Sequence, residues 1–170
     1  QQAVEELYRH GHRRIAALIS RPNDQSISQL RYEGYVQALE SHGIPVDPEL
    51  VISTGGFSAK DAYRAVQEKM AENVDFTALF AIADSMAIGA MRALMDAGRR
   101  IPEDCSVIAI DGLELSAYIE PPLTTLCQPM EEIGRRSAEI LLDMVQHKGS
   151  HACELLPTTL RQGRSVAAPR

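Results

Sequence analysis

The sequence predicts an α/β protein with a doubly wound parallel sheet, and three observations support this. Short apolar runs alternate along the chain with longer stretches in which apolar residues recur at helical spacing. The runs are continuously apolar, which is typical of strands buried on both faces of a parallel sheet. Glycine and proline stand at the ends of several helical stretches, where helices commonly stop and start. Right-handed crossovers between such strands place helices on both faces of the sheet.

The first unit combines the run at 15–19 with a helix over 27–43. All five residues of the run, IAALI, are apolar, so we expect a strand with no solvated face. Gly43 stands where a helix C-cap is expected, because glycine tolerates the left-handed conformation found there. A second, shorter strand follows at 50–52 (LVI).

The next two units carry clearer boundaries. Ser58 and Asp61 resemble a capping box, with Asp in place of the usual Glu, and predict the start of a helix over 58–71. The run 77–82 (TALFAI) predicts a third strand. A helix over 84–97 follows it, and this helix is apolar around most of its circumference.

The last part of the chain first continues the alternation of strands and helices and then ends in a different pattern. A fourth strand is expected at 107–110, followed by a helical turn near 114–118, and a fifth strand at 123–126. A long helix over 129–146 comes next. Residues 152–166 have the pattern of extended segments, for which the sequence offers no partner strand.

Composition and charge limit the classes of function. The chain carries 17 Lys and Arg against 23 Asp and Glu, a formal net charge of −6. Binding to DNA through its phosphates needs clustered cations, so this chain is not expected to grip DNA itself. Adjacent basic residues, expected at solvated helix ends or faces, are Arg13-Arg14, Arg99-Arg100 and Arg135-Arg136. No stretch approaches the roughly 20 apolar residues of a membrane-spanning helix, so we expect no membrane association.

The cysteine content favours a reducing compartment. Cys105, Cys127 and Cys153 are widely spaced and odd in number, and no Cys-x-x-Cys pair occurs. This pattern indicates reduced thiols in the cytoplasm and not a disulfide framework. Cys105 lies in an apolar run and is expected in the core.

The expected topology defines a candidate binding site. Ligands of open parallel sheets bind beyond the carboxyl ends of the strands. One candidate residue follows each of the five strands, and in chain order these are Arg31, Phe57, Asp84, Asp111 and Gln128. Their convergence on one edge predicts a site for a small polar molecule.

Two of these candidates are charged, and each has an alternative explanation. The planar guanidinium of Arg31 suits paired bonds to hydroxyls or carboxylates, but a surface arginine paired with Glu33 or a nearby acid would fit as well. Asp111 follows four apolar residues, so its carboxylate needs polar partners. A pair of ligand hydroxyls would supply them, and so would a backbone turn at Asp111-Gly112.

The other candidates are also ambiguous. Asp84 fits the N-cap of its helix, a role that does not exclude ligand contact. Phe57 fits a core position, yet in a chain without tryptophan it could form the apolar wall against a sugar ring.

Motifs of the common enzyme classes are missing from the sequence. It contains neither a Gly-x-Gly-x-x-Gly loop nor a Gly-x-Ser-x-Gly elbow. Asp84 and Asp111 could form a catalytic carboxylate pair, but nothing supplies the rest of a mechanism. His147 and His151 have metal-ligand spacing, but Gly149 interrupts any helix between them. We therefore expect no enzyme activity, no cofactor and no metal.

Five segments, in order and correctly spaced, resemble the effector-binding domain of the LacI/GalR family over nearly the whole chain. They are 7–15 (LYRHGHRRI), 30–35 (LRYEGY), 83–90 (ADSMAIGA), 101–111 (IPEDCSVIAID) and 122–129 (PLTTLCQP).

This resemblance implies a periplasmic-binding-protein-like fold of type I and a two-lobed sensor. Residues 1–126 would form its C-terminal lobe. Residues 127–170, with the helix 129–146 and an extended tail, would belong to or bridge to the N-terminal lobe. Most of that lobe would lie before residue 1, together with a helix-turn-helix that binds operator DNA.

The resemblance also implies a ligand and its contacts. The effector would be a small carbohydrate, with a nucleoside or purine as the second choice. The cleft positions would be Arg31, Phe57, Ala83, Asp84, Asp111 and Gln128. The sequence departs from the family pattern at three of its positions: Ala83 replaces Asn or Ser, Gly112 replaces Asp or Asn, and Ala109 replaces Gly. A stand-alone periplasmic sugar-binding protein of a transporter would share the fold, and a helix-turn-helix upstream would distinguish the regulator from it.

The helix 84–97 has more apolar surface than a helix that covers only a sheet requires. The resemblance favours a second subunit as the cover, in a symmetric homodimer. The expected interface residues are Met86, Ile88, Met91 and Met95. A neighbouring helix of the same chain is the alternative cover.

Overall fold

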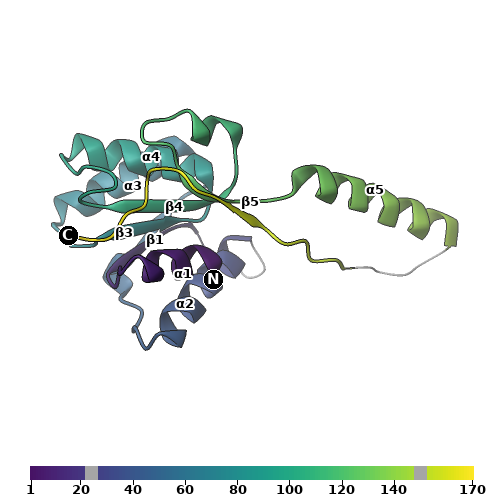
Figure 1. Ribbon diagram of the computed structural model, residues 1–170, viewed down its shortest axis with the longest axis horizontal. Coiled ribbons are helices and arrows are strands. Elements are labelled where there is room, and N and C mark those ends of the chain that lie inside the picture. Colours follow the sequence, from purple (N-terminus) through teal and green to yellow (C-terminus); the bar gives the residue numbers. More distant parts are fainter. Residues whose placement is uncertain (22–26, 148–152) are drawn as a thin grey trace.

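The computed structural model describes residues 1–21, 27–147 and 153–170, and these form a six-stranded sheet with helices on both faces (Figure 1). The strands are β1 (Ile15–Ser20), β2 (Val51–Thr54), β3 (Ala78–Ala81), β4 (Ser106–Asp111), β5 (Thr124–Cys127) and β6 (Thr159–Arg161). The helices are α1 (Gln2–Arg9), α2 (Ile27–Ser41), α3 (Ala59–Ala71), α4 (Asp84–Asp96) and α5 (Met130–His147), with short 3₁₀ turns η1 (Pro48–Leu50) and η2 (Glu114–Ala117).

The strand order β2-β1-β3-β4-β5-β6 confirms the doubly wound sheet. The first five strands are parallel to their neighbours. Every residue of β1 and β3 is buried, as their continuous apolar runs predict. Helices α1 and α2 cover one face and α3 and α4 the other, so the carboxyl ends of the strands meet at one edge (Figure 1).

Local signals place several helix ends correctly. Ser58 Oγ accepts a hydrogen bond from the amide of Asp61 at 3.1 Å and donates to its carboxylate at 2.7 Å, so the predicted cap of α3 is confirmed. Gly43, two residues beyond α2, adopts φ = 67°, as expected for the residue that ends a helix.

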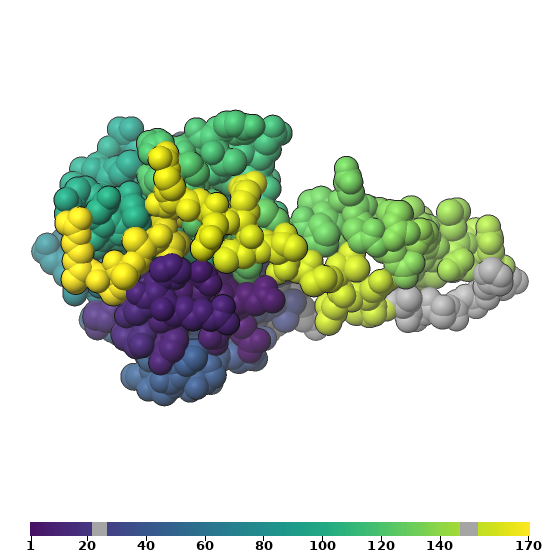
Figure 2. Space-filling view, in the orientation of Figure 1, coloured from purple at the N-terminus to yellow at the C-terminus, as the bar shows by residue number. Residues whose placement is uncertain are grey.

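The expectation that residues 152–166 have no partner strand is wrong. Strand β6 pairs antiparallel with β5, in a register that places Thr159 beside Cys127. Beyond it, the carbonyl of Ser165 accepts the amide of Val107 at 2.7 Å. Figure 2 shows this yellow segment lying across the body of the molecule. Because strand pairing joins residues that are far apart in the sequence, no local sequence pattern predicts which strand β6 pairs with.

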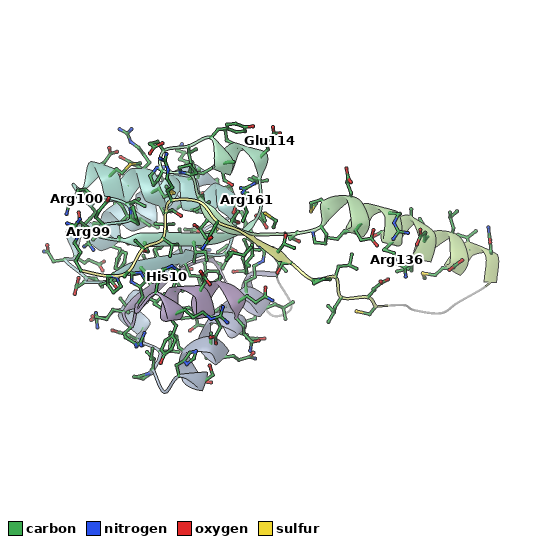
Figure 3. All side chains as sticks on the ribbon, in the orientation of Figure 1. His10, Arg99, Arg100, Glu114, Arg136 and Arg161 are labelled. Atoms are coloured by element: carbon green, nitrogen blue, oxygen red, sulfur yellow. The ribbon has the colours of Figure 1, made fainter. Side chains whose placement is uncertain are left out.

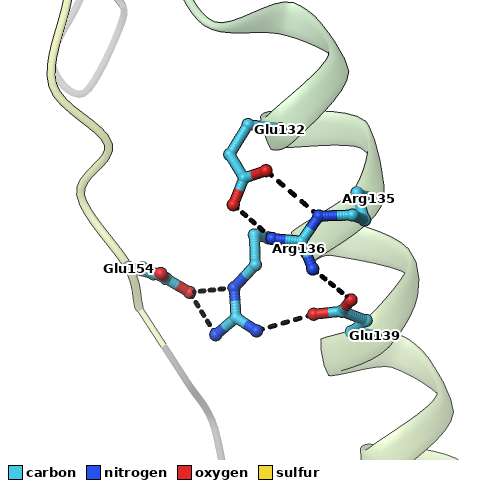
Figure 4. Close-up of polar contacts among 5 residues, drawn as sticks. All are labelled: Glu132, Arg135, Arg136, Glu139 and Glu154. Atoms are coloured by element: carbon cyan, nitrogen blue, oxygen red, sulfur yellow. Dashed lines mark hydrogen bonds and ion pairs between the residues drawn. The ribbon is translucent and has the colours of Figure 1, made fainter.

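Helix α5 and the residues from 153 to 158 project from the body as an arm (Figures 1 and 2). Arg136 joins the two parts of the arm, because its guanidinium contacts Glu154 at 2.6 and 2.8 Å as well as Glu139 at 2.6 Å (Figure 4). Arg135 bonds Glu132 and Glu139 along the helix. The apolar side chains that the arm leaves exposed are Met130, Leu141, Leu142, Val145 and Leu155.

Helix α4 is covered mainly by the chain itself. Met86 and Met91 are fully buried within the described chain, where α4 packs on α3 and on the sheet. Their expected role in a dimer contact is therefore wrong. Periodicity reveals that a helix face is apolar, but it does not tell whether a second subunit or a neighbouring helix covers that face. Ile88 is half-buried, and Met95 is exposed.

The predicted burial of Cys105 is confirmed, and burial raises the pKa of its thiol to about 12. Of the paired histidines that the sequence suggested as metal ligands, His151 lies outside the described residues. Within the described ranges, no group of three or more His, Cys, Asp or Glu side chains could hold a metal ion.

Candidate functional site

Three of the predicted site residues meet at the carboxyl edge of the sheet. Arg31, one turn into α2, donates through one nitrogen to the carbonyl of Ile82 and through Nη2 to Asp111 Oδ1 at 3.1 Å. Gln128, just after β5, donates to the same carboxylate oxygen at 2.8 Å. Strands β3, β4 and β5 are neighbours, so the topology brings together residues that are up to 97 positions apart along the chain (128 − 31).

The side chains of the Arg31–Asp111 pair are mostly buried, but both keep some exposure to solvent. The side chain of Arg31 is 14% exposed and that of Asp111 is 25% exposed. Of the acids considered as alternative partners of Arg31, Glu33 finds no support among the contacts of the described residues, and the acid that pairs with Arg31 is Asp111. The opposite charges balance, so the pair offers donors and acceptors without a net charge.

The backbone at Asp111 is strained. Its φ is 137°, a conformation that L side chains rarely adopt, and Gly112 follows with φ = 79°. Non-glycine residues held in such regions cost about 1–3 kcal/mol and cluster at functional sites. The turn at Asp111-Gly112 is therefore present as well, and it does not replace the polar role of the carboxylate.

The departure from the family pattern at Gly112 has a steric reason in this chain. A Cβ at this position would lie 2.7 Å from the Cα of Cys127 and 2.5 Å from its Sγ. Real Cβ contacts are never that short with backbone, so β5 excludes a side chain here. A larger residue at this position would require β5 to move.

A hollow of about 430 Å³ lies beside the polar cluster. Arg31 and Gln128 line it together with the apolar side chains of Ile110 and Leu126. Gln1 and Gln2 at the start of α1, and the return segment Leu156, Pro157 and Thr158, form the rest of its lining. Binding sites for small molecules combine such apolar walls with a few placed polar groups.

Asp84 behaves differently from the other candidates. It is not the N-cap of α4, since Ala83 occupies that position and makes no side-chain capping bond. The Asp84 carboxylate is 0% exposed and accepts bonds from Thr125 Oγ1 at 2.5 Å and from Ser116 Oγ and the amide of Leu113, both at 2.8 Å. Its oxygens therefore face donors inside the chain and not the hollow.

The remaining candidates lie along the same edge. Ala83 is buried and directly follows Ile82, whose carbonyl holds Arg31. Phe57, in the loop after β2, is 40% exposed, and its carbonyl accepts Ser85 Oγ at 2.7 Å. Because β1 and β3 separate β2 from β4, Phe57 sits at the far end of the edge from Asp111.

Arg161 is a residue that sequence reasoning missed. It lies at the end of β6 and donates to the carbonyls of Gly112 and Leu113, immediately after Asp111. The sequence predicts an extended segment around Arg161, but it carries no local signal for the strand or loop that this segment contacts.

No helix among the described residues is both long and apolar enough to cross a membrane.

Comparison with known proteins gives a consistent result. Residues 4–166 match the model of the periplasmic binding protein-like domain family. The transcriptional repressor CytR of Escherichia coli K12 is 40% identical over 160 residues, which is 91% of this chain and 46% of the repressor. The transcriptional regulator CelR of Thermobifida fusca is 35% identical over 159 residues, 94% of this chain and 46% of the regulator. The chain thus spans about half the length of these curated relatives.

Solved structures agree. A complex of the regulator CelR with cellobiose superposes with a TM-score of 0.88 at 34% identity, covering 97% of this chain and 50% of that one. A LacI-family regulator from Enterococcus faecium with bound ribose gives 0.85 at 32% identity, covering 98% and 61%. A lac repressor dimer bound to operator gives 0.88 at 32% identity, covering 97% and 56%.

Proposed function

Because the chain belongs to the family of periplasmic binding protein-like domains, in the form found in LacI/GalR-type regulators, we propose that it is the ligand-sensing part of a DNA-binding transcription regulator. A small carbohydrate is the proposed effector, and its binding would alter the affinity of the whole protein for operator DNA. A domain that senses a ligand for a DNA-binding head works where the DNA is, so the proposed location is the cytoplasm.

One observation carries the choice of ligand. The Arg31–Asp111–Gln128 cluster presents guanidinium donors, a carboxylate acceptor and an amide that can do both, with the charges balanced. Such a set suits neighbouring hydroxyl groups, each of which donates and accepts. A free anion would have to compete with Asp111 for Arg31. A nucleoside, whose ribose carries the same pair of hydroxyls, is the second candidate.

The relatives favour a regulator over the solute-binding protein of a transporter. Those named above are described as transcriptional repressors or regulators, and none as an enzyme. We propose no catalytic role, since the buried carboxylate of Asp84 is occupied and Asp111 is paired with a cation.

We further propose that the chain contributes one lobe of a two-lobed sensor. Residues 1–126 would be the C-terminal lobe, and within 127–170 helix α5 would pack on the N-terminal lobe. The exposed apolar residues of α5 support this, because Leu141, Leu142 and Val145 have no cover among the described residues. The tail from Thr159 onward would belong to the C-terminal lobe, since β6 extends its sheet.

A homodimer is proposed as well, with a revised surface. The loop with η2 exposes Leu115 at 62% and Tyr118 at 77%. Together with Ile88 and Met95 of α4, these residues would form the apolar face between two subunits. Operator DNA would be bound by a helix-turn-helix in another part of the full-length protein.

The test is calorimetric titration of the full-length protein with D-ribose, cellobiose, adenosine and adenine. We expect a carbohydrate to bind, and Arg31→Ala and Gln128→Ala to weaken its binding. Loss of a hydrogen bond to a charged group costs about 1.5–3 kcal/mol, a loss of roughly 10- to 150-fold in affinity for Arg31. Arg13→Ala, an exposed arginine at the opposite edge of the sheet, is the matched control. Equal affinity in all variants would reject the site, and binding of adenine alone would reject the ligand class.

A further inference from the structure

The loop that follows Asp111, residues 112–118, is held from two sides. On one side the buried Asp84 carboxylate accepts the amide of Leu113 and the hydroxyl of Ser116, each at 2.8 Å. On the other side stands Arg161 at the end of β6. The loop therefore connects the first residue of α4 with the strand that returns from the arm.

Arg161 forms hydrogen bonds with the first residues of this loop. Its Nη2 donates to the carbonyl of Leu113 at 2.9 Å and to Ser116 Oγ, and its Nη1 donates to the carbonyl of Gly112 at 3.4 Å. In Figure 3 its side chain points from β6 toward the loop that carries Glu114. Within the described chain, its Nε is buried without a hydrogen-bond partner. The hydrogen bonds of Arg161 to the loop therefore all come from its terminal nitrogens.

The loop needs such a hold because the residue before it is strained. Asp111 has φ = 137°, which an aspartate leaves readily unless its surroundings prevent it. If the carbonyls of Gly112 and Leu113 were released, the backbone at Asp111 could relax to negative φ. That rotation would turn its carboxylate away from Arg31 and Gln128.

We propose that Arg161 is a positioning residue of the ligand site, which keeps the Asp111 carboxylate in place by holding the two carbonyls that follow it. This inference rests on the proposed function only for what Asp111 binds. The position of the carboxylate itself can be measured without any ligand.

The experiment is carbon-13 NMR of the full-length protein labelled at the aspartate side-chain carboxyl. The Asp111 resonance is assigned by its loss in Asp111→Asn. We expect the chemical shift of this resonance to move toward that of a free aspartate in Arg161→Met, and to return most of the way in Arg161→Lys. Arg164→Met is the matched control, because among the described residues the side chain of Arg164 bonds only the surface residue Glu120.

An Asp111 resonance that is unchanged in Arg161→Met would overturn the proposal, even if the variant melts at a lower temperature. Should that variant fail to fold, Arg161→Gln, which keeps one amide donor, must still move the resonance, and an unchanged signal there would overturn it too.

A binding measurement complements the NMR result. A compound from the calorimetric panel that binds the wild type should bind Arg161→Met about tenfold more weakly, the usual scale for supporting partners of ligating groups, and Arg164→Met equally well. If no compound binds, the proposed function fails while the NMR test still decides the role of Arg161. If a sugar binds and the resonance does not move, only the role of Arg161 is rejected.

Discussion

Two single residues of this chain have properties that substitution can test: a strained backbone at Asp111 and a buried side chain at His12. Asp111 keeps a backbone conformation that favours glycine, and it does so between Arg31 and the loop that Arg161 holds. Buried His12 is the second case at this scale. Its ring forms hydrogen bonds with Thr77 Oγ1 at 2.9 Å and with the carbonyl of Ala167 at 2.8 Å. It therefore connects the residue before β3 to the C-terminal tail. Each residue gives a prediction that substitution can test.

The strain at Asp111 predicts that two substitutions differ in stability. Both Asp111→Gly and Asp111→Ala remove the carboxylate, but only glycine relaxes the backbone. The Gly variant should be more stable than the Ala variant by about 1–2 kcal/mol, because relief of roughly 1–3 kcal/mol of strain outweighs the entropy that glycine loses on folding. Urea denaturation of both variants measures this difference. A more stable alanine variant would show that the backbone at this position is not strained.

His12 predicts a dependence of stability on pH. Burial lowers the pKa of His12 below its ordinary value, with the charges of His10 and Arg13 acting in the same direction. The unfolded chain therefore binds a proton more readily than the folded chain. The stabilisation from neutral His12 is complete above the unfolded pKa of about 6.5 and is lost as the pH falls through the lower folded pKa.

The comparison is between the wild type and His12→Gln, by urea denaturation at pH 7.5 and pH 5.5. The wild type should be the more stable protein at pH 7.5, and its advantage should shrink at pH 5.5. An advantage that is the same at both pH values would contradict the proposed titration.

At the scale of elements, helix α4 is fixed by how closely it approaches α3. A Cβ at Gly89 would lie 2.0 Å from the carbonyl oxygen of Ala59, so the two helices leave no room for a side chain. This contact explains why a helix that is apolar on most sides does not need a second subunit to cover all of it. The arm shows the opposite case, since Gly134 of α5 has nothing within 4 Å of the position of its Cβ.

The same substitution should therefore act in opposite directions on the two helices. Gly89→Ala should destabilise the protein by about 1–3 kcal/mol or more, because overpacking exceeds the gain of roughly 1 kcal/mol in helix propensity. Gly134→Ala should keep or raise stability. Thermal unfolding followed by circular dichroism measures both. A stable Gly89→Ala variant would show that α3 and α4 can separate.

At the scale of the whole molecule, the body and the arm differ in how their apolar side chains are covered. The body buries a hydrophobic core, whereas the arm leaves apolar side chains exposed among the described residues. Strand β6 adds an edge strand to the sheet, and the tail that follows it bonds Ser106 of β4 and His12 through Ala167. The arm is tied only to itself by Arg136 and leaves its apolar face uncovered within the described chain. Among the described residues, exposed apolar side chains therefore lie together on α5 and on the loop with η2.

The second of these surfaces predicts the effect of a charge on assembly. Tyr118→Glu in the full-length protein should shift the dimer toward monomer, because it places a carboxylate in the proposed apolar contact. Leu30→Glu, an exposed leucine on the other face of the sheet, should leave the dimer intact. Sedimentation velocity distinguishes the two species. A monomeric wild type, or a dimeric Tyr118→Glu variant, would rule out this face.

By itself the sequence determined strands β1 to β5 and helices α2 to α5, their order, and the residues that follow these strands at the carboxyl edge. Continuous apolar runs specify strands buried on both faces, Ser58 and Gly43 mark helix ends, and parallel order then brings Arg31, Asp111 and Gln128 together. These signals are local or follow from the strand order, so they do not depend on which other elements pack nearby.

Only the tertiary structure decided which way a side chain turns and what covers an apolar face. Asp84 turned inward because Leu113, Ser116 and Thr125 supply donors there. Met86 and Met91 were buried because α4 packs on α3 and on the sheet. The pairing of β6 with β5, and with it the contact of Arg161 with the residue after Asp111, joins residues that are between 32 (159 − 127) and 49 (161 − 112) positions apart. Such choices depend on partners that approach through space, and a periodic pattern records that a face is apolar or polar without recording what meets it.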